Sequence, residues 1–168
     1  MIITNTPQKT LAKAVELKGI GLHSGKAIDL VLRPAAADCG FVFVRTDLDP
    51  QVEIPALAQY VSKTDRGTTL SVEGVDVQTT EHVLAALVGC GINNCRIELN
   101  GAEVPILDGS SKPFVEAIQT AGIQDQEALQ EIFVVQENIH ITDEASGSEI
   151  LIVPAESTSL TVLIDFET

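Results

Sequence analysis

The sequence is short of basic residues, of cysteines and of long apolar runs. Ten lysines and arginines stand against 24 aspartates and glutamates, and the resulting net charge of −14 argues against broad binding to nucleic-acid phosphates. The apolar runs are too short to span a bilayer. Residues 1–5 also lack the basic segment and apolar core of a secretory signal. We therefore expect a cytoplasmic protein without a transmembrane segment and without a nucleic-acid partner.

The small number of cysteines argues against two further classes of protein. Cys39, Cys90 and Cys95 are odd in number and form no CxxC pair, which favours reduced thiols over a disulfide framework or a structural zinc site. Hydrophobic residues make up 45% of the 168 residues and charged residues 20%, an ordinary balance for a globular protein. This length suffices for one good core, or for one domain and part of another.

One stretch, residues 79–91, organises the chain. Thr79 is suited to cap a helix, Glu81 then lies where the helix dipole favours an anion, and Gly89 ends the helix. Apolar residues behind the cap predict a buried face: Val83, Leu84, Leu87 and Val88. The pattern therefore holds the carboxylate of Glu81 beside the imidazole of His82 at the start of a buried helix. This pair could serve chemistry, or it could be the polar first turn of a core helix.

The rest of the first 123 residues predicts strands and a second helix. Alternating patterns indicate strands at residues 11–18, 27–33, 41–45, 49–54, 68–78 and 94–99. The glycine-rich residues 19–26 have neither Walker A nor dinucleotide spacing, so we interpret them as a hairpin connection. His23 in this turn could face a site or be an ordinary exposed histidine. Ser111 and Gly122 bound the second helix, and Asp108 before it favours a turn over a supporting role at a site. We expect an α+β layered domain over residues 1–123.

Residues 124–168 echo the beginning of the chain. A polar linker is predicted at 124–127, followed by strands at 132–136, 139–141, 149–155 and 160–166. Residues 149–155 resemble residues 29–35, and their prolines, Pro154 and Pro34, are 154 − 34 = 120 positions apart. This spacing predicts two like-folded units, the second cut off before its helices. Such a sheet exposes apolar surface. We therefore expect a fragment, or a chain that depends on a partner or on self-association.

Several blocks carry a family resemblance over the whole chain. They are Gly19-Ile20-Gly21-Leu22-His23-Ser24-Gly25-Lys26, Arg45-Thr46-Asp47-Leu48, Thr79-Thr80-Glu81-His82 and Glu103-Val104-Pro105-Ile106-Leu107-Asp108-Gly109-Ser110. Together they resemble the N-terminal half of the UDP-3-O-acyl-N-acetylglucosamine deacetylases, zinc enzymes that catalyse the committed step of lipid A synthesis. The resemblance implies two similar α+β domains in a β-α-α-β sandwich, with the second repeat truncated here. It also implies UDP-3-O-acyl-N-acetylglucosamine as substrate.

The resemblance also implies residue roles. His82 matches the first of the family's zinc ligands, Glu81 its general base, and His23 a histidine that holds substrate near the cleft. The family's remaining ligands and its second catalytic histidine belong to its other half, and His140 in a predicted strand is interpreted as structural. We therefore expect half of a zinc site, inactive alone. The alternatives are a scaffold or binding module that retains the fold, or a fragment without a function of its own.

Overall fold

The computed structural model describes residues 2–164. Its contacts divide the chain into two compact units, one formed by Asn5–Gln130 and the other by Met1–Thr4 with Glu131–Thr168. The larger unit holds both α-helices of the described chain and the main sheet. The expected domain boundary after residue 123 stays a prediction.

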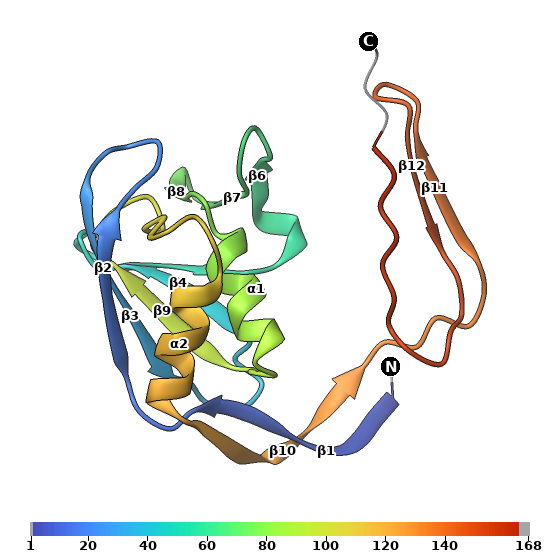
Figure 1. Ribbon diagram of the computed structural model, residues 1–168, viewed down its shortest axis with the longest axis horizontal. Helices are drawn as coiled ribbons and strands as arrows, with labels where there is room; N and C mark the ends of the chain where they lie inside the picture. Colours follow the sequence, from blue (N-terminus) through green and yellow to red (C-terminus); the bar gives the residue numbers. More distant parts are fainter. Residues whose placement is uncertain (1, 165–168) are drawn as a thin grey trace. The chain divides into compact units, whose positions relative to one another are not determined.

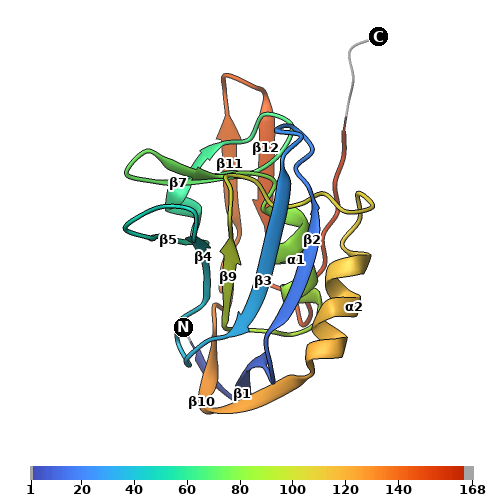
Figure 2. The same cartoon turned by 90° about the vertical axis from the view of Figure 1, so that its left-hand side faces the viewer.

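The larger unit is built on a five-stranded sheet with the order β2-β3-β9-β4-β5 (Figures 1 and 2). Its strands are β2 (Val15–Ile20), β3 (Ala27–Pro34), β4 (Phe41–Arg45), β5 (Val52–Pro55) and β9 (Cys95–Leu99). Strand β3 runs antiparallel to β2 and β9, whereas β4 runs parallel to β9 and antiparallel to β5. The predicted alternation is confirmed in β9, where Cys95, Ile97 and Leu99 are buried and the residues between them are not.

Two helices supply the other half of the core. Helices α1 (Glu81–Gly89) and α2 (Lys112–Ala121) lie along the sheet in Figure 1 and bury residues of their apolar faces, among them Val83, Leu87, Phe114 and Ile118. Gly122 ends α2 with a φ of 74°, as predicted for a glycine cap. Strands backed by helices confirm the α+β class. Within residues 2–164, no helix is both long and apolar enough to cross a membrane.

A smaller three-stranded sheet precedes α1. It contains β6 (Val61–Lys63), β7 (Thr69–Val72) and β8 (Val75–Val77), and it follows the 3-10 helix η1 (Ala58–Tyr60). The predicted tight turn joins β7 to β8 through Glu73 and Gly74, with φ angles of 52° and 82°. Positive φ at both central residues matches the right-handed twist of a hairpin. The turn is followed by β8, and α1 begins at Glu81, four residues after β8 ends.

The prediction of one continuous strand over residues 11–18 is wrong. Strand β1 (Ile2–Leu11) ends before β2 begins at Val15. The backbone N–H of Ala12 donates to the carbonyl of Gly122 at 2.9 Å, so the chain changes partner at this point. An alternating pattern does not reveal such a change of sheet, because the residues on both sides keep the same period.

The predicted linker at 124–127 is also wrong, since it lies within β10 (Ile123–Ile132), which pairs with β1. The side-chain amide of Asn94, which is 1% exposed, donates to Gln8 Oε1 and Gln126 Oε1, each at 2.8 Å. Gln126 in turn donates to the Ala35 carbonyl at 2.9 Å. One polar residue of the predicted linker, Gln126, thus joins a partly buried amide network that connects β1 and β10 to Asn94.

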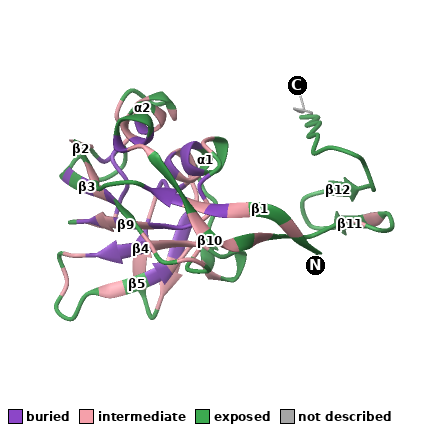
Figure 3. Ribbon diagram, turned by 90° about the horizontal axis from the view of Figure 1, so that it is seen from below, coloured by how far each residue is buried: buried purple, intermediate pink, exposed green. Residues whose placement is uncertain are grey.

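The smaller unit contains one antiparallel hairpin of β11 (Ile139–Asp143) and β12 (Ser148–Ile152). Figure 3 colours most of this hairpin as exposed, in contrast to the sheet of the larger unit. His140 lies in β11 with its Nε2 atom 3.4 Å from Glu149 Oε2, both side chains being exposed. Residues 160–164 of the last predicted strand have no regular structure, and residues 165–166 lie outside the described residues.

Candidate functional site

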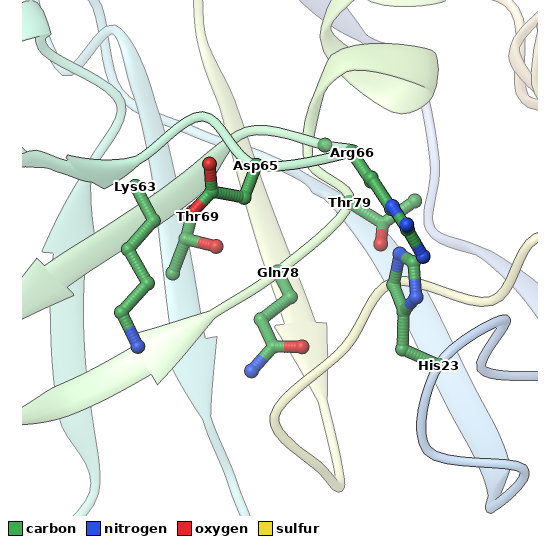
Figure 4. Close-up of a pocket in the computed structure, with 8 residues that line it drawn as sticks. His23, Lys63, Asp65, Arg66, Thr69, Gln78 and Thr79 are labelled. Carbon is green, nitrogen blue, oxygen red and sulfur yellow. The ribbon is translucent and has the colours of Figure 1, made fainter.

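Three segments of the larger unit enclose a polar cavity of about 250 Å3 (Figure 4). They are the β2–β3 turn, the loop between β6 and β7, and the segment that leads from β8 to α1. The lining residues are His23, Lys63, Asp65, Arg66, Gly67, Thr69, Gln78 and Thr79. Segments from three separate parts of the sequence thus meet at this cavity.

The cavity carries both signs of charge. Lys63 is the last residue of β6, Asp65 and Arg66 belong to the β6–β7 loop, and His23 faces them from the β2–β3 turn. In Figure 4 the side chains of His23 and Arg66 point toward one another. Arginine and lysine are well suited to bind anionic oxygens. The cavity therefore suits a polar ligand with a negative group, although the chain as a whole is acidic.

The start of α1 differs by one residue from the prediction. Thr80, not Thr79, is the N-cap, and it makes no capping hydrogen bond with its side chain. Its hydroxyl donates instead to the carbonyl of Thr68 at 3.1 Å. Thr79 has a φ of 59°, in the left-handed region, and its hydroxyl donates to Glu103 Oε1 at 3.3 Å. The side chains of both threonines thus connect the start of α1 to neighbouring segments and make no capping hydrogen bond.

Glu81 is half-buried in the first turn of α1, as the sequence predicted. Its Oε2 atom accepts a hydrogen bond of 2.9 Å from the Thr68 backbone N–H. A β-carbon placed on Gly67, which lines the cavity, would lie 3.4 Å from Glu81 Oε1. One carboxylate oxygen is therefore held by the β6–β7 loop, and the other lies next to a lining residue.

His82 follows Glu81 in α1 and is half-buried. Neither side chain belongs to the cavity lining, so the structure brings His23, but not Glu81 or His82, directly into that wall. Among residues 2–164 there is no group of three or more histidines, cysteines, aspartates or glutamates that could hold a metal ion. Within this described part of the chain no such group includes His82, and its role as a zinc ligand stays a prediction.

Glu103 is a functional candidate that the sequence interpretation missed. Its side chain is 1% exposed and accepts hydrogen bonds from the backbone N–H groups of His23 and Ser24 at 2.9 and 2.8 Å. Burial acts to raise the pKa of Glu103, but the hydrogen bonds from Ser24, His23 and Thr79 outweigh it, and the pKa lies below its usual value. The only signal in the sequence is one carboxylate within the otherwise uncharged residues 101–107.

Two further blocks of the resemblance have structural roles. Asp108 accepts hydrogen bonds from the backbone N–H and the hydroxyl of Ser110 at 2.9 and 2.8 Å, the turn chemistry that we predicted. Arg45 is 8% exposed and binds both carboxylate oxygens of Asp47 at 2.8 Å, while its Nη1 donates to the Asp76 carbonyl at 2.8 Å. Arg45 therefore ties β4 to the hairpin that leads to α1.

The family model of the UDP-3-O-acyl N-acetylglycosamine deacetylases matches residues 8–168. The chain therefore belongs to this family, which confirms the resemblance that the sequence motifs carried.

Individual relatives agree with the family match. The chain is 49% identical over 160 residues to a UDP-3-O-acyl-N-acetylglucosamine deacetylase of Myxococcus xanthus, covering 95% of this chain and 50% of the relative. It is 48% identical to one of Hahella chejuensis, covering 95% and 52%. It is also 44% identical to the bifunctional enzyme LpxC/FabZ of Chlorobaculum tepidum, covering 95% and 34%. The chain thus spans about half the length of the two deacetylases, and less of the bifunctional enzyme.

Proposed function

We propose that this chain carries one part of the active site of a cytoplasmic, zinc-dependent deacetylase. The reaction is hydrolysis of the acetamide of UDP-3-O-acyl-N-acetylglucosamine, the committed step of lipid A biosynthesis. The observation that carries the proposal is the family match over residues 8–168, together with a Glu81–His82 pair at the start of α1, beside a polar cavity. A family match alone would not distinguish a catalytic chain from a scaffold that keeps the fold.

Glu81 acts as the general base in this proposal. Water adds to the acetamide carbonyl carbon as it loses a proton, and the C–N bond then breaks as the nitrogen takes up a proton, so that acetate and the sugar amine are released. Glu81 accepts the proton that water loses in the first step. The hydrogen bond from Thr68 N–H to Oε2 supports this role, because it fixes one carboxylate oxygen and directs the other toward Gly67 and the cavity wall.

His82 would supply one ligand to a zinc ion, and further ligands would have to come from residues other than those described here. A catalytic zinc requires three protein ligands and an open position. The residues described here provide no such set. We therefore infer that the chain alone binds zinc weakly and has little or no deacetylase activity.

His23 contributes to substrate binding in this proposal. It lines the cavity together with Lys63 and Arg66, so a negative group of the substrate would meet donors from both the β2–β3 turn and the β6–β7 loop. The backbone N–H of His23 donates to Glu103 Oε1 at 2.9 Å.

The metal proposal is tested by measuring the zinc content and affinity of the purified chain. The chain is examined alone and mixed with a C-terminal fragment of a related deacetylase. We expect stoichiometric zinc only in the mixture and its loss with His82→Ala. His140→Ala is the matched control, since its exposed side chain contacts Glu149 in the hairpin. Tight zinc in the chain alone that survives His82→Ala would contradict the proposal.

Activity of the mixture separates the enzyme from the scaffold alternative. Glu81→Gln keeps the size of the side chain but removes the base, so deacetylation should fall by about 10²- to 10⁴-fold. Glu116→Gln, in the exposed face of α2, should leave the rate unchanged. A scaffold would lose nothing with Glu81→Gln.

A further inference from the structure

Glu103 is a buried carboxylate without a part in the proposed reaction. Its backbone segment is paired with Gln78: Gln78 N–H donates to the Ala102 carbonyl at 2.9 Å, and Val104 N–H donates to the Gln78 carbonyl at 3.0 Å. The main chain at Glu103 is therefore fixed beside the segment that begins α1. Burial of a charged side chain costs free energy unless its oxygens are well hydrogen-bonded.

Both oxygens of Glu103 are occupied by groups that border the cavity. Oε1 accepts from His23 N–H at 2.9 Å and from the Thr79 hydroxyl at 3.3 Å, and Oε2 accepts from Ser24 N–H at 2.8 Å. The β2–β3 turn also packs closely on this carboxylate, because a β-carbon at Gly21 would overlap Oε2. One side chain thus binds the turn that carries His23 and the residue two positions before Glu81.

The β6–β7 loop is attached to the same short segment by other groups. Thr68 donates its N–H to Glu81, and its carbonyl accepts from the Thr80 hydroxyl and, at 3.3 Å, from the Thr80 N–H. Residues 79–81 therefore anchor both walls of the cavity, and Glu103 provides the side-chain connection to the β2–β3 wall. Loss of Glu103 should release this wall while the Thr68 loop remains attached.

We propose that Glu103 is a positioning residue, which fixes the His23 turn to Thr79 and thereby sets the place of the His23 imidazole relative to Glu81. The importance of this placement for deacetylation rests on the proposed function. The placement itself does not, because it follows from hydrogen bonds within the chain.

The test is backbone amide hydrogen exchange, followed by NMR, in Glu103→Ala and Glu103→Gln. The amides of His23 and Ser24 should exchange about tenfold faster or more in Glu103→Ala, since each loses a hydrogen bond to a charged acceptor. The Thr68 amide, which donates to Glu81, serves as an internal reference and should change less. Glu103→Gln keeps one acceptor oxygen, so it should give an intermediate rate at one of the two amides.

A control separates positioning from general destabilisation. Ile118→Val removes a methylene from a fully buried residue of α2. It should not increase amide exchange at His23 and Ser24 more than at Thr68. If Glu103→Ala does not fold, Thr79→Val removes one partner of the carboxylate and should produce the same pattern in smaller measure. Exchange at His23 and Ser24 that stays at the wild-type rate, or rises no more than at Thr68, would overturn the proposal.

The two proposals fail in different experiments. Glu81→Gln should lower deacetylation in the reconstituted mixture by about 10²- to 10⁴-fold and leave the His23 and Ser24 amides protected. Retained activity in Glu81→Gln would defeat the proposed function, and the exchange result for Glu103 would stand. Unchanged exchange in Glu103→Ala would defeat the positioning role, and the assignment of Glu81 would stand.

Discussion

Strands β3 and β12 carry closely similar patterns in different surroundings. Leu30 and Leu32 in β3 are completely buried, whereas Ile150 and Ile152, 120 positions later, are 57% and 39% exposed. Strand β3 lies between β2 and β9 in a sheet that shares its core with two helices, whereas β12 pairs with β11 in a two-stranded sheet. The alternating pattern is therefore sufficient for a strand in both places, but burial depends on the elements around it.

The largest difference between the two strands should appear when their equivalent apolar residues are truncated. Leu32→Ala removes a completely buried side chain and leaves a cavity, which should lower the free energy of unfolding by about 2–5 kcal/mol. Ile152→Ala acts on a side chain that water already reaches, so the loss should stay below about 1 kcal/mol. Urea denaturation of both variants measures the difference. Equal losses would mean that β12 is covered in solution.

Polar pairs should show the same contrast with smaller effects. Arg45 is buried and bonded to Asp47 and Asp76, so Arg45→Met should cost about 1–3 kcal/mol through unpaired acceptors. His140 and Glu149 face each other across the exposed hairpin, and His140→Ala should change stability by less than about 0.5 kcal/mol. Thermal unfolding of the two variants gives the comparison. A loss with His140→Ala as large as with Arg45→Met would place that pair in a buried contact.

The comparison also shows which features the sequence could predict. Period and turn residues identified most strands of the larger unit, both α-helices and the Glu73–Gly74 hairpin, because these depend on neighbours in the chain. The change of sheet at Ala12 and the inclusion of Gln126 in β10 depend on partners far away in the sequence. Gly122 is 122 − 12 = 110 positions from Ala12, and Ala35 is 91 positions from Gln126. Local pattern carries no information about such pairing, so residues 124–127 resembled a linker.

For the candidate site, too, the sequence indicated some residues and missed others. Motif resemblance indicated Glu81, His82 and His23, and the structure adds that His23 lines a cavity whose other walls come from residues 63–69 and 78–79. Glu103 was missed because its role comes from burial next to two backbone N–H groups, and neither burial nor backbone direction is visible in a single carboxylate of the sequence. The role of His82 as a zinc ligand stays a prediction.

The smallest expected effect is a difference in acid sensitivity. Hydrogen bonds outweigh burial at Glu103, and the hydrogen bond from Arg45 is the main cause at Asp47, so both carboxyls have pKa values below their usual ones. A lowered pKa in the folded state contributes stability above the unfolded pKa, near 4.5 for Glu103, and this contribution is lost as the pH falls through the folded pKa. The stability of the larger unit should therefore decrease with acid below about pH 5, and Glu103→Gln should flatten that dependence. Asp143 at the end of β11 also has a lowered pKa, caused by hydrogen bonds from Ser146 and Ala145. Its carboxyl is exposed and belongs to the smaller unit, so Asp143→Asn should change the unfolding curve of the larger unit less than Glu103→Gln does. Unfolding followed from pH 7 to pH 3 checks both variants, and an equal flattening in each would show that buried and exposed carboxyls contribute alike.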